Sequence, residues 1–102
     1  MRESAIERPV RHKALHELKV PSVKLNLTGQ AGWPDVIFWI PGGKPLLIEF
    51  KAPGEEANPL QQHNHEILEF LGYKTEVHDD EESALRSIAK AVGASRLPKK
   101  GR

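Results

Sequence analysis

Two carboxylates and a lysine are spaced in this sequence so that they can form one site. Asp35 follows a Gly-Trp-Pro run. Thirteen residues separate it from Glu49, and Lys51 lies two positions beyond Glu49. Carboxylate oxygens suit Mg²⁺ or Mn²⁺, and a metal ion, a lysine and an attacking water form a hydrolytic arrangement for phosphodiesters. The same residues also allow a plain surface ion pair between Glu49 and Lys51. Against that reading, Glu49 interrupts an apolar run, where an unpaired charge is costly.

The segments around these residues predict a β-hairpin that positions them. Residues 36–40 are apolar and β-prone, a Pro-Gly-Gly-Lys-Pro turn follows, and residues 46–48 begin a second apolar strand. Because side chains alternate along a strand, Glu49 and Lys51 point to one face. In an antiparallel pair the start of the first strand lies beside the end of the second. Asp35, Glu49 and Lys51 are therefore expected to meet at one edge of the sheet.

Apolar periodicity and turn residues predict seven helices and strands in the whole chain. In order, they are a helix at 3–18, strands at 22–28, 36–40 and from 46, a helix at 59–71, a strand at 73–78 and a helix at 81–92. Pro9 indicates that the first helix starts later or kinks. The inward residues expected in the second and third helices are Leu60, Ile67, Leu68 and Leu71, and Leu85, Ile88, Ala89 and Val92. The order α-β-β-β-α-β-α predicts a single α/β domain with helices packed on the sheet faces.

Composition limits the class of protein to which the chain can belong. The 102 residues suit one domain with a modest core, and the absence of cysteine excludes a zinc ribbon or thiol catalysis and fits a reducing cytosol. No apolar run is long enough to span a membrane and there is no signal-peptide pattern, so a cytoplasmic location is expected, in a bacterium or a phage-infected host. The net charge of +1 excludes a strongly basic DNA-coating protein.

Basic residues gather in two parts of the chain and are candidates for contacts with a nucleic-acid backbone. Those singled out are Arg8, Arg11, Lys24, Lys99 and Lys100. An ordinary solvated surface is the alternative interpretation. The compact domain is expected to span residues 1–93, and residues 94–102 are expected to form a basic, flexible tail.

The sequence around the two carboxylates resembles a known nuclease family. The shared features are Gly-Trp-Pro-Asp ending at Asp35, Glu-x-Lys from Glu49 to Lys51, Asn-Pro-Leu-Gln ending at Gln61, and Gly72 eleven residues later. This set is similar to the VRR-NUC branch of the PD-(D/E)xK nuclease superfamily, in its small stand-alone, phage-like form. The resemblance runs from Glu3 to the strand after Gly72. It implies a restriction-endonuclease-like core with a mixed central sheet.

The resemblance also implies a metal-dependent DNA endonuclease and a role for each motif residue. Asp35, Glu49 and the backbone carbonyl of Phe50 would hold Mg²⁺ or Mn²⁺, and Lys51 would orient the attacking water. Gln61 would position the water, the lysine or a phosphate. In-line attack would then leave a 3′-hydroxyl and a 5′-phosphate.

The resemblance leaves some positions around this site open. The family pattern Glu-x-x-Ile places Glu3 as a further metal acid, but Glu7 is one turn on and nearly on the same helix face, so either can take that role. Gln62 replaces Gln61 if the register shifts by one. Asn64 departs from the aromatic residue that the family often has there. His65 shares a face with Gln61 and is a candidate DNA contact, whereas a histidine metal site is not expected.

The small stand-alone members of this family resemble junction-resolving enzymes. A homodimer has two-fold symmetry and two active sites, which suits the paired cuts of a four-way (Holliday) junction in DNA repair. A flap or other structure-specific nuclease is the alternative within the class. A non-catalytic nucleic-acid-binding module is the alternative from another class, and the presence of Asp35, Glu49 and Lys51 argues against it.

Overall fold

The computed structural model describes residues 2–25 and 31–95. The elements, in order, are α1 (Glu3–Leu18), β1 (Ser22–Lys24), β2 (Val36–Phe38), β3 (Leu46–Phe50), α2 (Pro59–Phe70), β4 (Lys74–His78) and α3 (Glu81–Ser95). The predicted α-β-β-β-α-β-α order and the mixed α/β fold are confirmed. Among the described helices, none combines the length and apolar character needed to cross a membrane.

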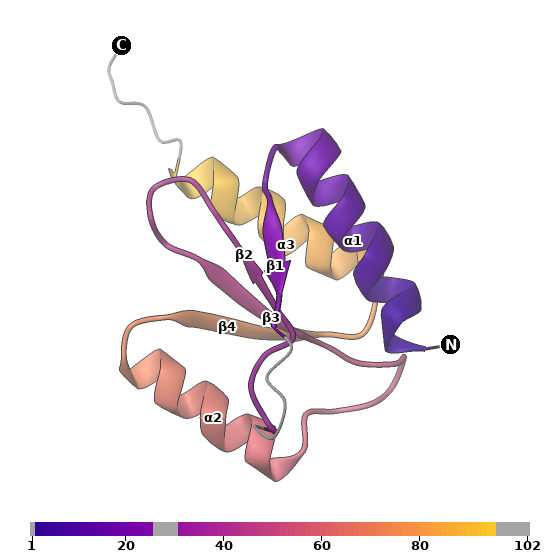
Figure 1. Ribbon diagram of the computed structural model, residues 1–102, viewed down its shortest axis with the longest axis vertical. Helices are drawn as coiled ribbons and strands as arrows, with labels where there is room; N and C mark the ends of the chain where they lie inside the picture. Colours follow the sequence, from indigo (N-terminus) through magenta and orange to yellow (C-terminus); the bar gives the residue numbers. More distant parts are fainter. Residues whose placement is uncertain (1, 26–30, 96–102) are drawn as a thin grey trace.

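The four strands form one mixed sheet in the order β1-β2-β3-β4. The first three strands are antiparallel, and β4 runs parallel to β3. Figure 1 shows α1 and α3 on one face of this sheet and α2 on the other. Residues that alternate along β3 therefore face either the helix pair or the single helix.

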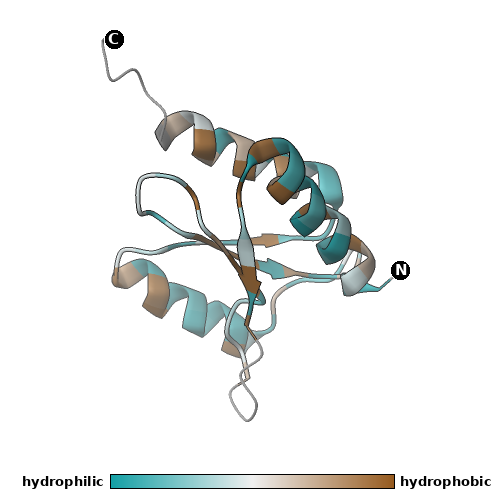
Figure 2. Cartoon of the chain, turned by 45° about the horizontal axis from the view of Figure 1, so that its top comes forward, coloured by the Kyte–Doolittle hydropathy of each residue, from teal (hydrophilic) through white to brown (hydrophobic). Residues whose placement is uncertain are grey.

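The hydrophobic core lies between the sheet and the helix pair α1 and α3. Leu46, Ile48 and Phe50 of β3 point into it. Helix α1 contributes Ile6, Val10 and Ala14, and α3 contributes Ala84, Ile88 and Val92. In Figure 2 the central strands carry much of the hydrophobic colour, while the helices alternate between hydrophobic and hydrophilic residues. All five residues of β3 are buried, which makes it the strand that holds the site most rigidly.

Helix α1 neither starts late nor is interrupted at Pro9. It runs through Pro9 from Glu3 to Leu18, and Lys19 ends it in the left-handed conformation at φ 61°. Ile6 and Val10, on either side of the proline, are both buried in the core. Their burial holds the two halves of the helix in line despite the donor that proline lacks.

Several predicted boundaries and inward faces are wrong. Strand β1 ends at Lys24, and residues 26–28 of the strand predicted there lie outside the described residues. Strand β2 ends at Phe38, and α3 continues past residue 92 to Ser95. Ala89 is exposed, and so are Leu60 and Ile67 of α2 and Leu71, which follows the helix as its C-cap. The face of α2 that packs on the sheet is polar instead, because Asn64 and His65 are the buried residues of this helix.

Candidate active site

The hairpin of β2 and β3 brings Asp35 to the end of β3. The Asp35 N–H donates to the Ile48 carbonyl at 3.1 Å, and the Phe50 N–H donates to Asp35 Oδ2 at 2.8 Å. Both the backbone and the side chain of Asp35 are thus fixed against β3. Glu49 lies between these two contact residues in β3, so the two carboxylates become neighbours.

Glu49 is buried, and a hydrogen-bond donor contacts only one of its two carboxylate oxygens. Its side chain projects to the α2 face of the sheet, where Oε2 accepts a hydrogen bond from Gln61 Nε2 at 2.8 Å and lies 3.8 Å from Lys51 Nζ. The residue is 3% exposed, and no N–H or O–H group of the described residues donates to its Oε1 atom, although the Asp35 carboxyl can hydrogen-bond with Glu49 when one of the two is protonated. A buried carboxylate oxygen without a hydrogen-bond donor is costly, so this site favours a ligand that can bind an oxygen.

Burial raises the pKa of the Glu49 carboxyl to about 8, and the negative charge of Asp35 adds to this effect. The nearby Lys51 ammonium opposes it. Burial also raises the pKa of Asp35, although the Phe50 N–H bond opposes the change. Two neighbouring buried carboxyls resist ionising together. A bound cation would favour the doubly ionised form of the pair.

Gln61 owes its position to the start of α2. Its backbone N–H donates to Asn58 Oδ1, and its side-chain Oε1 accepts from the Asn58 N–H, both at 2.9 Å. This capping box fixes the helix end and leaves Gln61 Nε2 to donate to Glu49. Lys51 is held at its backbone, because its N–H donates to the His78 carbonyl at 2.9 Å.

The two candidate N-terminal acids differ in their surroundings. Glu7 is 5% exposed, and its Oε2 lies 3.4 Å from Lys24 Nζ and 3.7 Å from Arg11 Nη1. Glu3 has no such cation partner in the described structure. The charges of Glu7 and, to a lesser extent, Glu3 raise the pKa of Asp35, and Glu3 also raises the pKa of Glu49. Across residues 2–25 and 31–95, no three acidic or histidine side chains lie close enough together to hold a metal ion. The choice between Glu3 and Glu7 stays a prediction.

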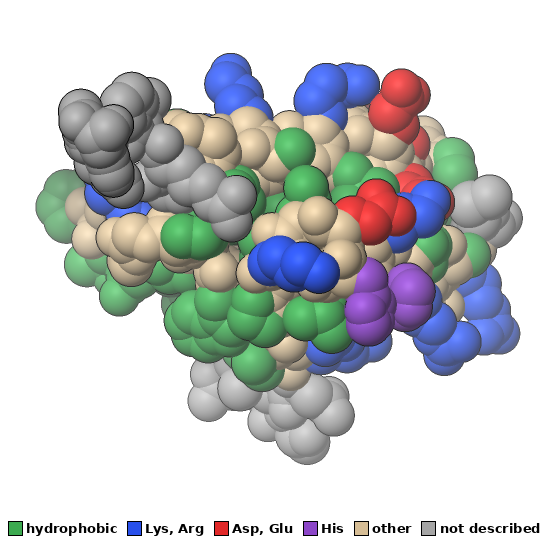
Figure 3. All heavy atoms as spheres, turned by 90° about the horizontal axis from the view of Figure 1, so that it is seen from above, with side chains coloured by type: hydrophobic (Ala, Val, Ile, Leu, Met, Phe, Trp, Pro, Cys, Tyr) green, Lys and Arg blue, Asp and Glu red, His purple; other side chains and the backbone are tan. Residues whose placement is uncertain are grey.

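Among the residues predicted to contact DNA, Lys24 lies near the acids, because it pairs with Val36 in the register of β1 and β2 and its charge lowers the pKa of Asp35. Lys24 and Arg11 pair with Glu7, and Arg11 Nε also donates to Ser22 Oγ at 2.9 Å. Arg8 is exposed, and Lys99 and Lys100 lie outside the described residues. On the face drawn in Figure 3, Lys and Arg side chains stand at separate places and form no continuous patch.

Sequence patterns missed the role of Asn64 and misjudged His65. The Asn64 amide donates to the Ala31 carbonyl at 3.3 Å and so ties α2 to the loop that leads to Asp35. His65 is buried rather than presented to a ligand, its Nε2 has no partner in the described structure, and burial lowers its pKa. Their helical spacing from Gln61, three and four residues on, was the available signal that all three share one face.

Gly32 is expected to be essential for the approach of this loop to α2. Its φ is 91°, and an added Cβ would lie 2.6 Å from Asn64 Nδ2 and 2.7 Å from Leu60 Cγ. We expect Gly32→Ala to cost about 3 kcal/mol, from backbone strain and the displaced Asn64 amide. The matched control is Gly43→Ala, at φ 80° with nothing within 4 Å of the added Cβ, which should cost about 1 kcal/mol. Urea unfolding measures both, and equal losses would contradict a packing role for Gly32.

Comparisons with known proteins agree with this fold. The family model of the VRR-NUC domain matches residues 3–92. "Putative nuclease p44" of Acyrthosiphon pisum secondary endosymbiont phage 1 is 35% identical over 94 residues, covering 90% of this chain and 96% of the phage protein.

Two solved structures share the fold. One, a VRR-NUC domain, has a TM-score of 0.73 and 22% identity, covering 84% of this chain and 92% of its own. The other, a VRR-NUC domain protein, has a TM-score of 0.76 and 20% identity, covering 91% and 89%. The match of the family model to residues 3–92, with a phage relative that is covered over 96% of its own length, shows that this chain belongs to the VRR-NUC family of nucleases.

Proposed function

We propose that this nuclease is a metal-dependent, structure-specific DNA endonuclease that resolves four-way junctions as a homodimer. The observation that carries the catalytic part is the buried carboxyl pair. Asp35 and Glu49 have raised pKa values, mainly because they are buried, and no N–H or O–H group of the described residues donates to Glu49 Oε1. A pair of this kind is costly to ionise unless it binds a cation.

The donor set fits a hard divalent ion such as Mg²⁺ or Mn²⁺. Asp35, Glu49 and the backbone carbonyl of Phe50 would hold it with oxygen atoms alone, which such ions prefer. When bound, the ion would polarise the scissile phosphate and lower the pKa of a water molecule. Glu3 is favoured over Glu7 as an additional acid, because two cations already neutralise Glu7.

The protein's own groups would orient the reactants. Lys51 Nζ lies 3.8 Å from Glu49 Oε2, and its side chain is 11% exposed, so it can donate to a water or to a phosphate oxygen beside Glu49. Gln61 fixes the rotation of the Glu49 carboxylate through its 2.8 Å hydrogen bond. In-line attack of the water would leave a 5′-phosphate and a 3′-hydroxyl.

Exposed apolar side chains on α2 support the homodimer. Phe70 is 90% exposed and Leu71 63% exposed, and Ile67 and Tyr73 beside them in sequence are also exposed. Large apolar groups gathered on a surface mark a protein–protein interface. A two-fold dimer through such a surface would carry two sites for the two cuts that a four-way junction needs.

Cleavage of labelled four-way junction, flap and linear duplex tests this function. Wild type should make paired symmetric cuts in the junction with Mg²⁺ or Mn²⁺ and none in EDTA. Lys51→Ala and Asp35→Ala should lose activity by about 100- to 10,000-fold, because they remove groups that act on the reacting atoms. Lys13→Ala and Glu82→Ala, which remove charges that pair outside the site, should cut as wild type does.

The outcomes separate the parts of the proposal. Equal cutting of junction, flap and duplex would support a nuclease but exclude a junction-specific resolvase. A monomer in sedimentation at the concentration used for cleavage would remove the dimer. DNA binding without cleavage by wild type in either metal would favour the non-catalytic binding module.

A further inference from the structure

A cavity of about 600 Å³ lies at the end of the sheet away from the acids. The hairpin between β2 and β3 forms one wall and the last turns of α3 form the other, with Ile40 and Leu46 between them. Leu46 opens β3 and Glu49 stands three residues further along it, so the cavity and the carboxylates are about 10 Å apart along the strand. They also open on opposite faces of the sheet, because Leu46 faces α3 and Glu49 faces α2.

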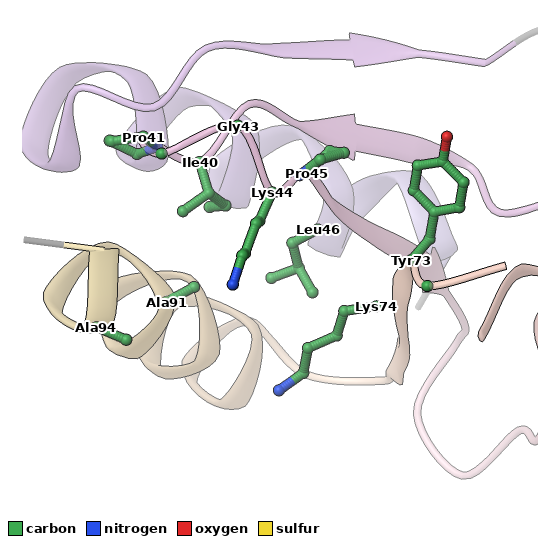
Figure 4. Close-up of a pocket in the computed structure, with 12 residues that line it drawn as sticks. Ile40, Pro41, Gly43, Lys44, Pro45, Leu46, Tyr73, Lys74, Ala91 and Ala94 are labelled. Atoms are coloured by element: carbon green, nitrogen blue, oxygen red, sulfur yellow. The ribbon is translucent and has the colours of Figure 1, made fainter. Parts of the chain in front are cut away.

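Lysine side chains converge on this cavity. Lys44 of the hairpin and Lys74 of β4 both line it, and Figure 4 shows both side chains extending toward the part of α3 that carries Ala91 and Ala94. A smaller adjoining cavity of about 190 Å³ shares Lys74 and adds Lys90. The two cavities also have Leu46, Ala91 and Ala94 in common. They therefore form one continuous depression with three ammonium groups, which we call the lysine groove.

The lysine groove contains little negative charge, and its one carboxylate already has hydrogen-bond partners. No acidic residue lines the larger cavity, and the smaller one has only Glu76. The Glu76 carboxylate is bound by His78 Nε2 at 2.6 Å and by Ser87 Oγ, and Lys74 Nζ lies 3.7 Å away. Lys44 and Lys90 have no ion-pair partner within the described residues. The charge of Glu76 and the partial charge of about −0.5 at the end of a helix such as α3 together do not balance three ammonium groups.

We propose that the lysine groove binds the phosphate backbone of the DNA substrate, outside the active site. The groove offers point charges on flexible stems and no fork of donors for a base edge, which suits phosphates and gives no base selectivity. Its apolar walls can pack against the sugars. This inference rests on the proposed DNA nuclease function, and it assigns a second DNA contact to the far end of the sheet.

Binding in EDTA tests the groove independently of cleavage. The test variant is Lys44→Gln/Lys74→Gln, and the matched control Lys13→Gln/Lys19→Gln also removes two charges. Fluorescence anisotropy with a labelled duplex of about 20 base pairs should show about tenfold weaker binding for the groove variant. Its plot of log affinity against log salt should be shallower by about 2, one for each lost phosphate contact. The control should stay within about twofold of wild type, and thermal unfolding checks that both variants fold.

A second readout uses wild type alone. Bound DNA should protect Lys44 and Lys74 from chemical acetylation and leave Lys19 reactive, as measured by mass spectrometry. The proposed role of the groove would be wrong if the two double variants lost DNA affinity equally, or if Lys44 stayed fully reactive while DNA was bound. If wild type cuts DNA and the groove variant binds DNA as tightly as wild type, only the proposal for the groove is wrong. If the groove variant loses affinity while wild type cuts no DNA, only the nuclease proposal fails.

Discussion

Glu49→Gln is expected to abolish DNA cleavage while stabilising the folded chain at pH 8. Loss of one of two acidic metal ligands should lower the cleavage rate by about 1,000-fold, or ~4 kcal/mol in the barrier. The amide has nearly the shape of the acid and can still accept the hydrogen bond from Gln61, so binding of DNA in EDTA should persist. Cleavage assays and urea unfolding of the same preparations measure both effects.

The gain in stability follows from the pKa of Glu49. Its pKa in the folded chain is about 8, raised above the ordinary value of 4.5 mainly by burial. A carboxyl whose pKa is raised in the folded chain holds its proton more tightly there than in the unfolded chain. The folded chain is therefore most stable below pH 4.5 and becomes less stable as the pH rises to 8. Glutamine removes this loss, which is worth about 4 kcal/mol at pH 8 and under about 1 kcal/mol at pH 5.

Glu76→Gln is the matched control in the neighbouring strand. The hydrogen bond from His78 is the main cause that lowers the pKa of Glu76. Its ionised form therefore stabilises the fold, and this stability is present above the ordinary pKa and lost in acid. The substitution should destabilise the protein at pH 8 and lower cleavage far less than Glu49→Gln does, because Glu76 lies in the lysine groove and outside the carboxyl pair. Loss of cleavage in Glu49→Gln together with a loss of stability would show a misfolded site rather than a missing ligand.

The hairpin that carries the acids was predictable because its determinants are local. The Pro-Gly-Gly-Lys-Pro turn fixes how residues 36–40 and 46–50 pair, and pairing alone places Asp35 beside the end of β3. The start of α2 was predictable for the same reason, since Asn58 and Gln61 bond to each other. These two local motifs set the ends of β3 and α2, and the packing of α2 on the sheet then brings Gln61 to Glu49.

The burial of α2 was not predictable, because a sequence pattern shows where an apolar stripe lies and not what covers it. Leu60, Ile67 and Leu71 form such a stripe, yet they are exposed. Asn64 is buried instead, because it binds a carbonyl that is 33 residues away in the sequence. The pairing of Glu7 with Lys24 is similar, since it depends on how α1 crosses β1.

Divalent cations are expected to stabilise the protein much more at pH 8 than at pH 6. The ion needs Glu49 ionised, and protons compete for this carboxylate up to its pKa of about 8. At an ion concentration 100 times the dissociation constant, binding adds about 2.7 kcal/mol. For a domain of this size, that gain raises the midpoint of thermal unfolding by about 10 °C. Melting curves with Mg²⁺, Mn²⁺ or EDTA at several pH values measure the difference.

The same melting curves with variants assign the effect to the carboxyl pair. Asp35→Asn and Glu49→Gln should lose most of the stabilisation by metal, because each leaves a single carboxylate in the site. Glu76→Gln should keep it, since its carboxylate is held by His78 and Ser87 on the other face of the sheet. A shift that is the same at pH 6 and pH 8, or that survives in Glu49→Gln, would place the ion elsewhere. If the shift depends on pH and is lost in both site variants, the buried Glu49 Oε1 atom and Asp35 are the ligands of the cation.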